Sequence, residues 1–235
     1  MPVAAFHEFK TRDELAETLA SDIAERLVPD IERGQFASIA LSGGSTPKLM
    51  LEKLGAELGD MKEMIYFALV DERYVSPDDE RSNERMIRNQ LKLDGHPGSE
   101  FLSLYQDDAQ PDEACKIAEV QLLDDDELPF DVVALGMGLD GHTASFFSDA
   151  DNLQLATNPD KAPLFVPINA PGAGETRITM TLPVIASATQ IILHIEGAEK
   201  RAVYEKALKD GLADELPIRH VLRHPNAAIL VYWAP

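Results

Sequence analysis

The sequence has a single cysteine and no long apolar run. Cys115 stands alone among 235 residues, so no intramolecular disulfide can form and a cysteine-rich zinc site is excluded. No apolar run reaches the length that spans a membrane. The N-terminus lacks the basic start and the apolar stretch of a signal peptide. From these features we expect a cytoplasmic protein that does not insert into membranes.

Basic residues are scarce relative to acidic ones. The chain has 21 Lys and Arg against 41 Asp and Glu, which gives a formal net charge of -20. Non-specific binding to nucleic acid requires a basic surface, and so does docking on anionic lipid, so we expect neither partner. High solubility is one explanation of this acidity. An anionic substrate is the alternative, and it would need a local cluster of Arg and Lys.

Common metal and serine-hydrolase motifs are missing. The chain contains no His-Glu-x-x-His, no cysteine pair and no EF-hand loop, so we expect no metal. It also contains no Gly-x-Ser-x-Gly, which argues against a serine hydrolase.

Short apolar runs alternate with amphipathic stretches along the chain. Buried strands are predicted over residues 36–41, 65–70, 130–135, 190–195 and 227–232. Helices are predicted after the capping box that starts at Thr11, after Pro47, and over 84–91, 111–123 and 198–208, whereas 150–176 is expected to be mostly loop. This alternation predicts an α/β fold with a mainly parallel sheet covered by helices on both faces. We expect a single domain over residues 1–235.

Three unusual segments begin directly after predicted strands, at Ser42, Asp71 and Gly136. In an open parallel sheet, ligands bind beyond the carboxyl ends of the strands. We therefore expect the three segments to converge on one crevice.

The first segment is a serine- and glycine-rich turn, Ser42-Gly43-Gly44-Ser45-Thr46-Pro47. Its glycines allow close approach of the backbone to a ligand, and the helix that follows presents free N–H groups and a positive dipole end. Thr46 is expected as the N-cap and Pro47 as the first helical residue. The segment predicts a phosphate cradle, with a plain strand-to-helix turn as the alternative.

The second segment, Asp71-Glu72-Arg73, places charges at the end of a buried strand, which packing does not explain. An exposed, salt-bridged loop is the alternative explanation. Two further cations, Arg177 and Lys200, are ordinary surface charges unless a phosphate lies near them. Lys200 stands near a predicted helix N-terminus, against the preference of the helix dipole, which favours an anionic neighbour.

The third segment, residues 136–143, holds three glycines, Asp140 and His142. Glycines allow an irregular turn that aims a side chain into a cleft, and histidine is the side chain best suited to proton transfer near neutral pH. A glycine turn with a surface histidine is the alternative. The other histidines lack such a setting, and we expect surface or packing roles for them: His7, His96, His194, His220 and His224.

Together these segments resemble the family of glucosamine-6-phosphate isomerases and 6-phosphogluconolactonases, and the lactonases in particular. The matching segments are 42–47, Asp71-Glu72-Arg73 with Ser82-Asn83, 136–145, 177–181 and Gly197 with Lys200. The resemblance implies a Rossmann-like α/β fold, no metal or organic cofactor, and hydrolysis of 6-phosphogluconolactone to 6-phosphogluconate in the oxidative pentose phosphate pathway. The sequence departs from the family after the histidine, where Phe146-Phe147-Ser148 replaces Leu-Phe-Pro.

The resemblance also suggests roles for individual residues. We interpret His142 as the base that activates water and as the acid that protonates the leaving oxygen. Asp71 is the expected orienting carboxylate or hydroxyl ligand, Asp140 shapes the turn, and Arg73 stabilises developing negative charge. The residues expected to hold the phosphate are Ser42, Gly43, Gly44, Thr46, Arg177 and Lys200.

Two alternatives use the same segments. An isomerase or deaminase of amino-sugar phosphates shares the glycine turns, an aspartate and a histidine, but Arg73 and the Thr143-Ala144-Ser145 run favour the lactonase. A non-catalytic sugar-phosphate sensor would carry a DNA-binding segment, whereas the first 35 residues predict one helix with an acidic excess. We expect a monomer or a weak dimer.

Overall fold

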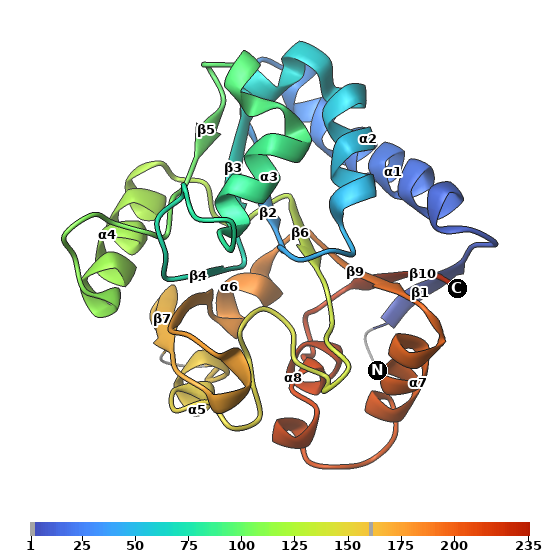
Figure 1. Ribbon diagram of the computed structural model, residues 1–235. Helices are drawn as coiled ribbons and strands as arrows, with labels where there is room; N and C mark the ends of the chain where they lie inside the picture. Colours follow the sequence, from blue (N-terminus) through green and yellow to red (C-terminus); the bar gives the residue numbers. More distant parts are fainter. Residues whose placement is uncertain (1–2, 160–161) are drawn as a thin grey trace.

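The computed structural model describes residues 3–159 and 162–235 and is built around an all-parallel sheet of seven strands (Figure 1). The strands pair in the order β1 (Val3–Glu8), β10 (Ile229–Ala234), β9 (Gln190–Glu196), β6 (Val132–Leu135), β2 (Ala37–Leu41), β3 (Ile65–Leu69) and β5 (Glu100–Phe101). Every residue of β2, β3 and β6 is buried, as their continuous apolar runs predicted.

Helices cover both faces of this sheet, which confirms the predicted α/β class. Figure 1 shows α1 (Arg12–Glu32) and α2 (Lys48–Leu58) on one side of the sheet and α7 (Ala198–Ala207) and α8 (Ile218–Leu222) on the other. The remaining α-helices are α3 (Asn83–Leu91), α4 (Pro111–Asp124), α5 (Leu153–Ala156) and α6 (Leu182–Ser187). Short 3-10 helices lie at Gly59–Met64, Leu93–Gly95, Pro171–Ala173 and Ala213–Glu215.

The start of α1 follows the predicted capping box. The Oγ1 atom of Thr11 accepts a hydrogen bond of 3.1 Å from the backbone N–H of Glu14. The apolar stripe of the helix, including Leu15, Leu19 and Ile23, is fully buried against the sheet and α2. Within the described ranges, no helix is both long enough and apolar enough to cross a membrane.

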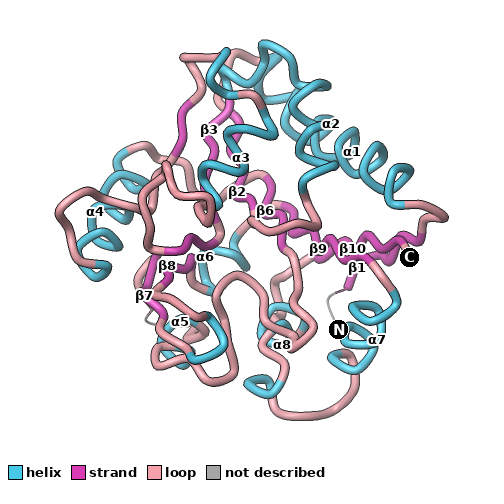
Figure 2. Tube along the Cα trace, in the orientation of Figure 1, coloured by secondary structure: helices cyan, strands magenta, loops and turns pink. Residues whose placement is uncertain are grey.

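A second, antiparallel sheet was not predicted. It consists of β4 (Asp71–Arg73), β8 (Arg177–Met180) and β7 (Phe165–Ile168), and it stands near α5 and α6 (Figure 2). Most of the described part of 150–176 is loop, as expected, but the prediction missed β7 and α5. Residues 160–161 of this segment lie outside the described residues. Pro167 breaks the strand signal of β7, and the sheet tolerates it because β7 is an edge strand. The prediction for the first 35 residues likewise missed β1.

The chain reverses its direction of travel across the large sheet between β2 and β6. From β2 it proceeds through β3 to β5 on one side, and it then returns to β6 and continues to β9 and β10 on the other side. Such a switch point opens a crevice beyond the carboxyl ends of the two strands. Here the N–H of Gly136, after β6, donates to the Oγ atom of Ser42, after β2, at 3.2 Å.

Candidate active site

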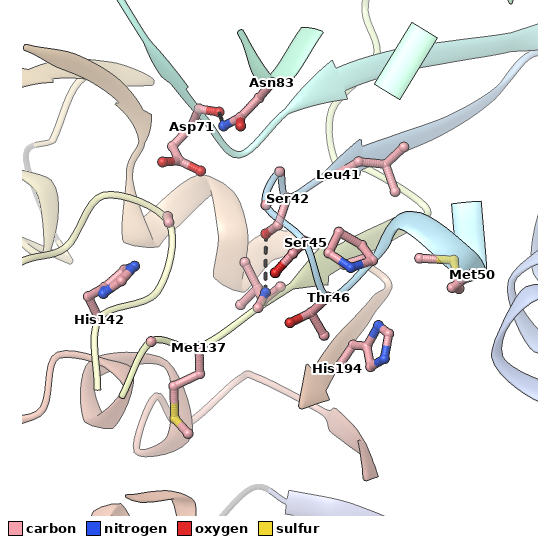
Figure 3. Close-up of a pocket in the computed structure, with 18 of the residues that line it drawn as sticks. Leu41, Ser42, Ser45, Thr46, Met50, Asp71, Asn83, Met137, His142 and His194 are labelled. Atoms are coloured by element: carbon pink, nitrogen blue, oxygen red, sulfur yellow. Dashed lines mark hydrogen bonds between the residues drawn. The ribbon is translucent and has the colours of Figure 1, made fainter. Parts of the chain in front are cut away.

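A cavity of about 300 Å³ opens at this switch point (Figure 3). The predicted site residues that line it are Ser42, Gly43, Gly44, Thr46, Asp71, Arg73, His142, Arg177 and Lys200. Asp140 does not line the cavity, but its carboxylate accepts hydrogen bonds from His142. The three segments that follow strands thus converge as predicted. Among residues 3–159 and 162–235, no group of three or more His, Cys, Asp or Glu side chains is placed to hold a metal ion.

A tight turn after β6 holds His142. The N–H of Gly138 donates to the carbonyl oxygen of His142 at 2.9 Å, and Gly141 adopts a positive φ of 80° that favours glycine. The imidazole stacks on the ring of Phe147, with 4.5 Å between centroids. Its side chain is 31% exposed, so the imidazole is anchored yet reachable from the cavity.

Asp140, rather than Asp71, orients the imidazole of His142. The Oδ1 atom of Asp140 lies 2.6 Å from Nδ1 of His142. The same oxygen accepts a hydrogen bond of 3.1 Å from the backbone N–H of His142. The hydrogen bond from His142 lowers the pKa of Asp140, so this carboxylate remains ionised and can only accept. Nδ1 therefore carries the proton, and the lone pair on Nε2 is free to act as a base.

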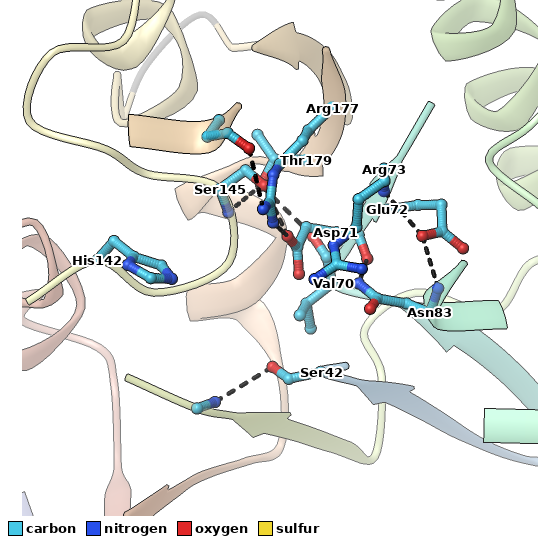
Figure 4. A network of polar contacts seen from close by, with 12 residues as sticks. Ser42, Val70, Asp71, Glu72, Arg73, Asn83, His142, Ser145, Arg177 and Thr179 are labelled. Atoms are coloured by element: carbon cyan, nitrogen blue, oxygen red, sulfur yellow. Dashed lines mark hydrogen bonds and ion pairs between the residues drawn. The ribbon is translucent and has the colours of Figure 1, made fainter. Parts of the chain in front are cut away.

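Asp71 instead belongs to a buried polar network (Figure 4). Its Oδ2 atom accepts a hydrogen bond of 2.6 Å from the hydroxyl of Ser145 and forms an ion pair with Arg177 at 3.4 Å. The expectation that Asp71 orients His142 is not met, because its carboxylate is held by Ser145 and Arg177.

Gly138 makes the contact between Asp140 and His142 possible. A Cβ atom at this position would lie 2.3 Å from Cε1 of His142 and 2.5 Å from Oδ1 of Asp140. We therefore expect Gly138→Ala to displace the imidazole and to lower kcat by at least about tenfold, the loss expected when a catalytic group is misplaced. Steady-state kinetics measure this effect. Gly95→Ala is the matched control, since its Cβ would meet no atom within 4 Å, and equal activity of the two variants would contradict the steric argument.

Two arginines face each other across β4 and β8. Arg73 pairs in register with Arg177, and both line the cavity. Arg177 lies over the ring of Phe147 at 5.2 Å, and Arg73 donates to the carbonyl oxygen of Arg81. In the described part of the chain, the buried Nε atom of each guanidinium has no hydrogen-bond partner. A buried donor without a partner is costly, so an anion in the cavity would stabilise both side chains.

Glu72 fixes the strand that carries Asp71 and Arg73. Its carboxylate accepts from the backbone N–H groups of Arg73, Asn83 and Glu84 and from the hydroxyl of Ser82. Burial raises the pKa of Glu72 to about 7, although the four hydrogen bonds act in the opposite direction. The carboxylate thus joins β4 to the start of α3.

Asn83 is a cavity residue whose role the sequence did not reveal. Its Nδ2 atom donates to the carbonyl oxygen of Asp71 at 2.9 Å. A Cβ atom on Gly43 would lie 1.9 Å from Oδ1 of Asn83. Packing against Asn83 therefore requires glycine at this position, in addition to any need for a bound ligand to approach the backbone. Gly44, with a φ of 94°, is required by its backbone conformation.

The opposite end of the cavity contains Thr46 and Lys200. The Nζ atom of Lys200 donates to Oγ1 of Thr46 at 3.0 Å, and burial lowers the pKa of Lys200. The predicted cap was wrong by one residue, because α2 starts at Lys48 with Pro47 as its N-cap and without a side-chain cap. The hydroxyl of Thr46 contacts the lysine instead, and the N–H groups at the start of α2 remain available to a ligand.

His194, for which we expected a surface or packing role, is buried as a packing residue would be, and it also forms part of the cavity wall. It is 3% exposed, and its Nε2 atom lies 3.1 Å from Oε1 of Glu196. The sequence indicated this position only by placing a histidine near the carboxyl end of the apolar run that forms β9.

The fold is an open parallel sheet, and the cavity at its switch point is lined by two histidines, one carboxylate and three cations. This arrangement is typical of an α/β enzyme. The chain belongs to the family of glucosamine-6-phosphate isomerases and 6-phosphogluconolactonases, whose model matches residues 10–232. A 6-phosphogluconolactonase of Rhizobium meliloti (strain 1021) is 40% identical over 232 residues, which cover 99% of each chain.

Solved structures agree with this assignment. A 6-phosphogluconolactonase from Shewanella baltica OS155 superposes with a TM-score of 0.90 at 34% identity and covers 99% of this chain and 98% of its own. The 6-phosphogluconolactonase of Trypanosoma brucei gives a TM-score of 0.83 at 26% identity over 100% of this chain and 97% of its own. A monomeric glucosamine-6-phosphate deaminase shares the fold, with a TM-score of 0.71 at 20% identity.

Proposed function

We propose that this chain hydrolyses 6-phospho-D-glucono-1,5-lactone to 6-phospho-D-gluconate, a step of the oxidative pentose phosphate pathway. The observation that carries the proposal is the hydrogen bond between Asp140 and His142 at the edge of a cavity lined by cations. The relatives also support the proposal, since 6-phosphogluconolactonases are similar to this chain over nearly its whole length.

In the proposed mechanism, Nε2 of His142 removes a proton from water as its oxygen attacks the lactone carbonyl carbon. Arg73 stabilises the tetrahedral oxyanion. The bond from this carbon to the ring oxygen then breaks, and the imidazolium returns its proton to that oxygen. The ionised Asp140 holds the ring and stabilises the imidazolium throughout.

The remaining cavity residues bind the two polar parts of the substrate. Lys200, Thr46 and the backbone at Ser42, Gly43 and Gly44 are proposed to hold the phosphate, with Arg177 completing the positive lining. Asp71 is proposed to accept hydrogen bonds from sugar hydroxyls. Binding a remote phosphate orients the ester for attack.

The role of Asp140 gives a prediction. Asp140→Asn keeps an acceptor but removes the charge that stabilises the imidazolium, so we expect kcat to fall by about tenfold or more while KM changes little. Initial rates at several lactone concentrations measure both constants. Asp60→Asn serves as the control, because Asp60 is fully exposed. An Asp140→Asn enzyme as fast as the control would remove Asp140 from the mechanism.

A comparison of substrates tests the proposed function against its alternatives. We expect enzyme-dependent opening of 6-phosphogluconolactone, much weaker activity on unphosphorylated gluconolactone, and no ammonia release from glucosamine 6-phosphate. Ammonia release without lactone opening would indicate the deaminase instead. Binding of sugar phosphates without turnover of either substrate would indicate the sensor.

A further inference from the structure

A second histidine lies in the wall of the cavity, across from His142. His194 is on β9, and Figure 3 shows it and His142 on opposite sides of the cavity. The imidazole of His194 is almost completely buried. The proposed mechanism gives this residue no role.

The hydrogen bonds of His194 leave one ring nitrogen unused. Nε2 lies 3.1 Å from the carboxylate of Glu196, an acceptor, so Nε2 carries a proton. Nδ1 is buried and has no hydrogen-bond partner among the described residues. A buried polar atom without a partner is unfavourable, and a group bound in the adjoining cavity can supply the partner.

Space for such a group exists beside the imidazole. On the neighbouring strand β6, Leu135 pairs with Leu193, and the next residue is Gly136. A Cβ atom on Gly136 would meet no atom within 4 Å, so this glycine leaves the cavity open on that side. Thr46 and Lys200, both proposed phosphate ligands, line the same cavity.

Charged and titratable groups lie on the elements next to His194. On its own strand, Glu196 also forms an ion pair with Arg12 of α1 at 3.3 Å, and it favours the charged form of Lys200 on α7. On the adjacent strand, Tyr232 pairs in register with His194 and donates its hydroxyl to Asp22. Four further residues of the cavity lining are uncharged. They lie at and just after the end of β6 and around the start of α2: Leu135, Gly136, Thr46 and Met50.

We propose that His194 is a proton-linked phosphate-binding residue. When a phosphate monoester enters the cavity, His194 takes up a proton from solvent and donates an Nδ1–H hydrogen bond to a phosphate oxygen, while Nε2–H continues to donate to Glu196. A dianionic ligand favours this protonated form, and histidine gains a proton near neutral pH. The inference rests on the proposed function and extends it, since phosphate affinity becomes dependent on pH through a residue remote from His142.

The test is calorimetric titration of 6-phosphogluconate into wild type, His194→Asn and His194→Phe at pH 6, 7 and 8. Two buffers with different ionisation enthalpies give the number of protons taken up. Asn places an amide donor near the position of Nδ1 but cannot titrate, and Phe removes the donor. Comparison between proteins cancels the titration of the ligand itself, and sulfate, which stays a dianion across this range, provides a second probe.

We expect wild type to take up more protons on binding 6-phosphogluconate than His194→Asn does. As the pH rises from 6 to 8, the affinity of wild type for this ligand should fall more than the affinity of His194→Asn. At pH 6, His194→Phe should bind roughly tenfold more weakly than wild type, as expected for loss of a charged hydrogen bond. In the hydrolysis of the phosphorylated lactone, the KM of His194→Phe should rise while its kcat stays nearly constant. Thermal unfolding of each variant confirms that it is folded.

Equal proton uptake by wild type and His194→Asn would overturn the role of His194 and leave the proposed function intact. Failure of wild type to bind 6-phosphogluconate would overturn the proposed function, and the role of His194 with it. The two failures are therefore distinguishable.

Discussion

Replacing His142 with Ala is expected to lower kcat by roughly 10²- to 10⁴-fold, the usual contribution of general acid-base catalysis. The variant loses both the base that activates water and the acid that protonates the ring oxygen. KM should change little, because the phosphate ligands remain in place. Stability should also change little, because the imidazole is partly exposed and its hydrogen-bond partner Asp140 lies in an exposed turn.

His220→Ala is the matched control for this experiment. His220 also pairs with an aspartate, with its Nε2 atom 2.7 Å from Oδ1 of Asp214, but it does not line the cavity. Removing it disrupts a similar pair without touching the proposed chemistry. An activity of His142→Ala within a few-fold of His220→Ala would show that His142 is not the proton-transfer residue.

Replacing Lys200 with Ala is expected to raise KM for the phosphorylated lactone by about tenfold or more, because a charged hydrogen bond to phosphate is lost. The change in kcat should be smaller, since Lys200 lies at the phosphate end of the cavity. Activity on unphosphorylated gluconolactone should not change. This last measurement separates loss of phosphate binding from general damage to the cavity.

Lys206→Ala provides the control for charge. Lys206 lies on the same helix as Lys200, but it is exposed and does not line the cavity. If both variants raise KM equally, the effect comes from the net charge of the protein and Lys200 is not a phosphate ligand.

Much of the fold could be predicted because its signals are local. The strand over 65–70 is a continuous apolar run, and it is buried at every residue. The capping box at Thr11 fixed the start of α1 correctly. By contrast, β7 contains a proline, and its strand character depends on pairing with the distant strand β8, which no local pattern encodes.

The site could be located but not fully assembled from the sequence. The rule that ligands bind beyond the carboxyl ends of parallel strands brought Ser42, Asp71 and His142 together correctly. The pairing of Asp140 with His142 depends on backbone torsions within a turn, and sequence separation gave no guide to them. The position of His194 depends on the register of β9 against β6, which is a property of the assembled sheet.

The most direct test of the account is the release of acid from freshly prepared 6-phosphogluconolactone in weak buffer, compared with the same solution without enzyme. The control is essential because the lactone also opens unaided. We expect a large, enzyme-dependent acceleration that scales with protein concentration. A rate equal to that of the control, from protein shown to be folded, would contradict the proposed function.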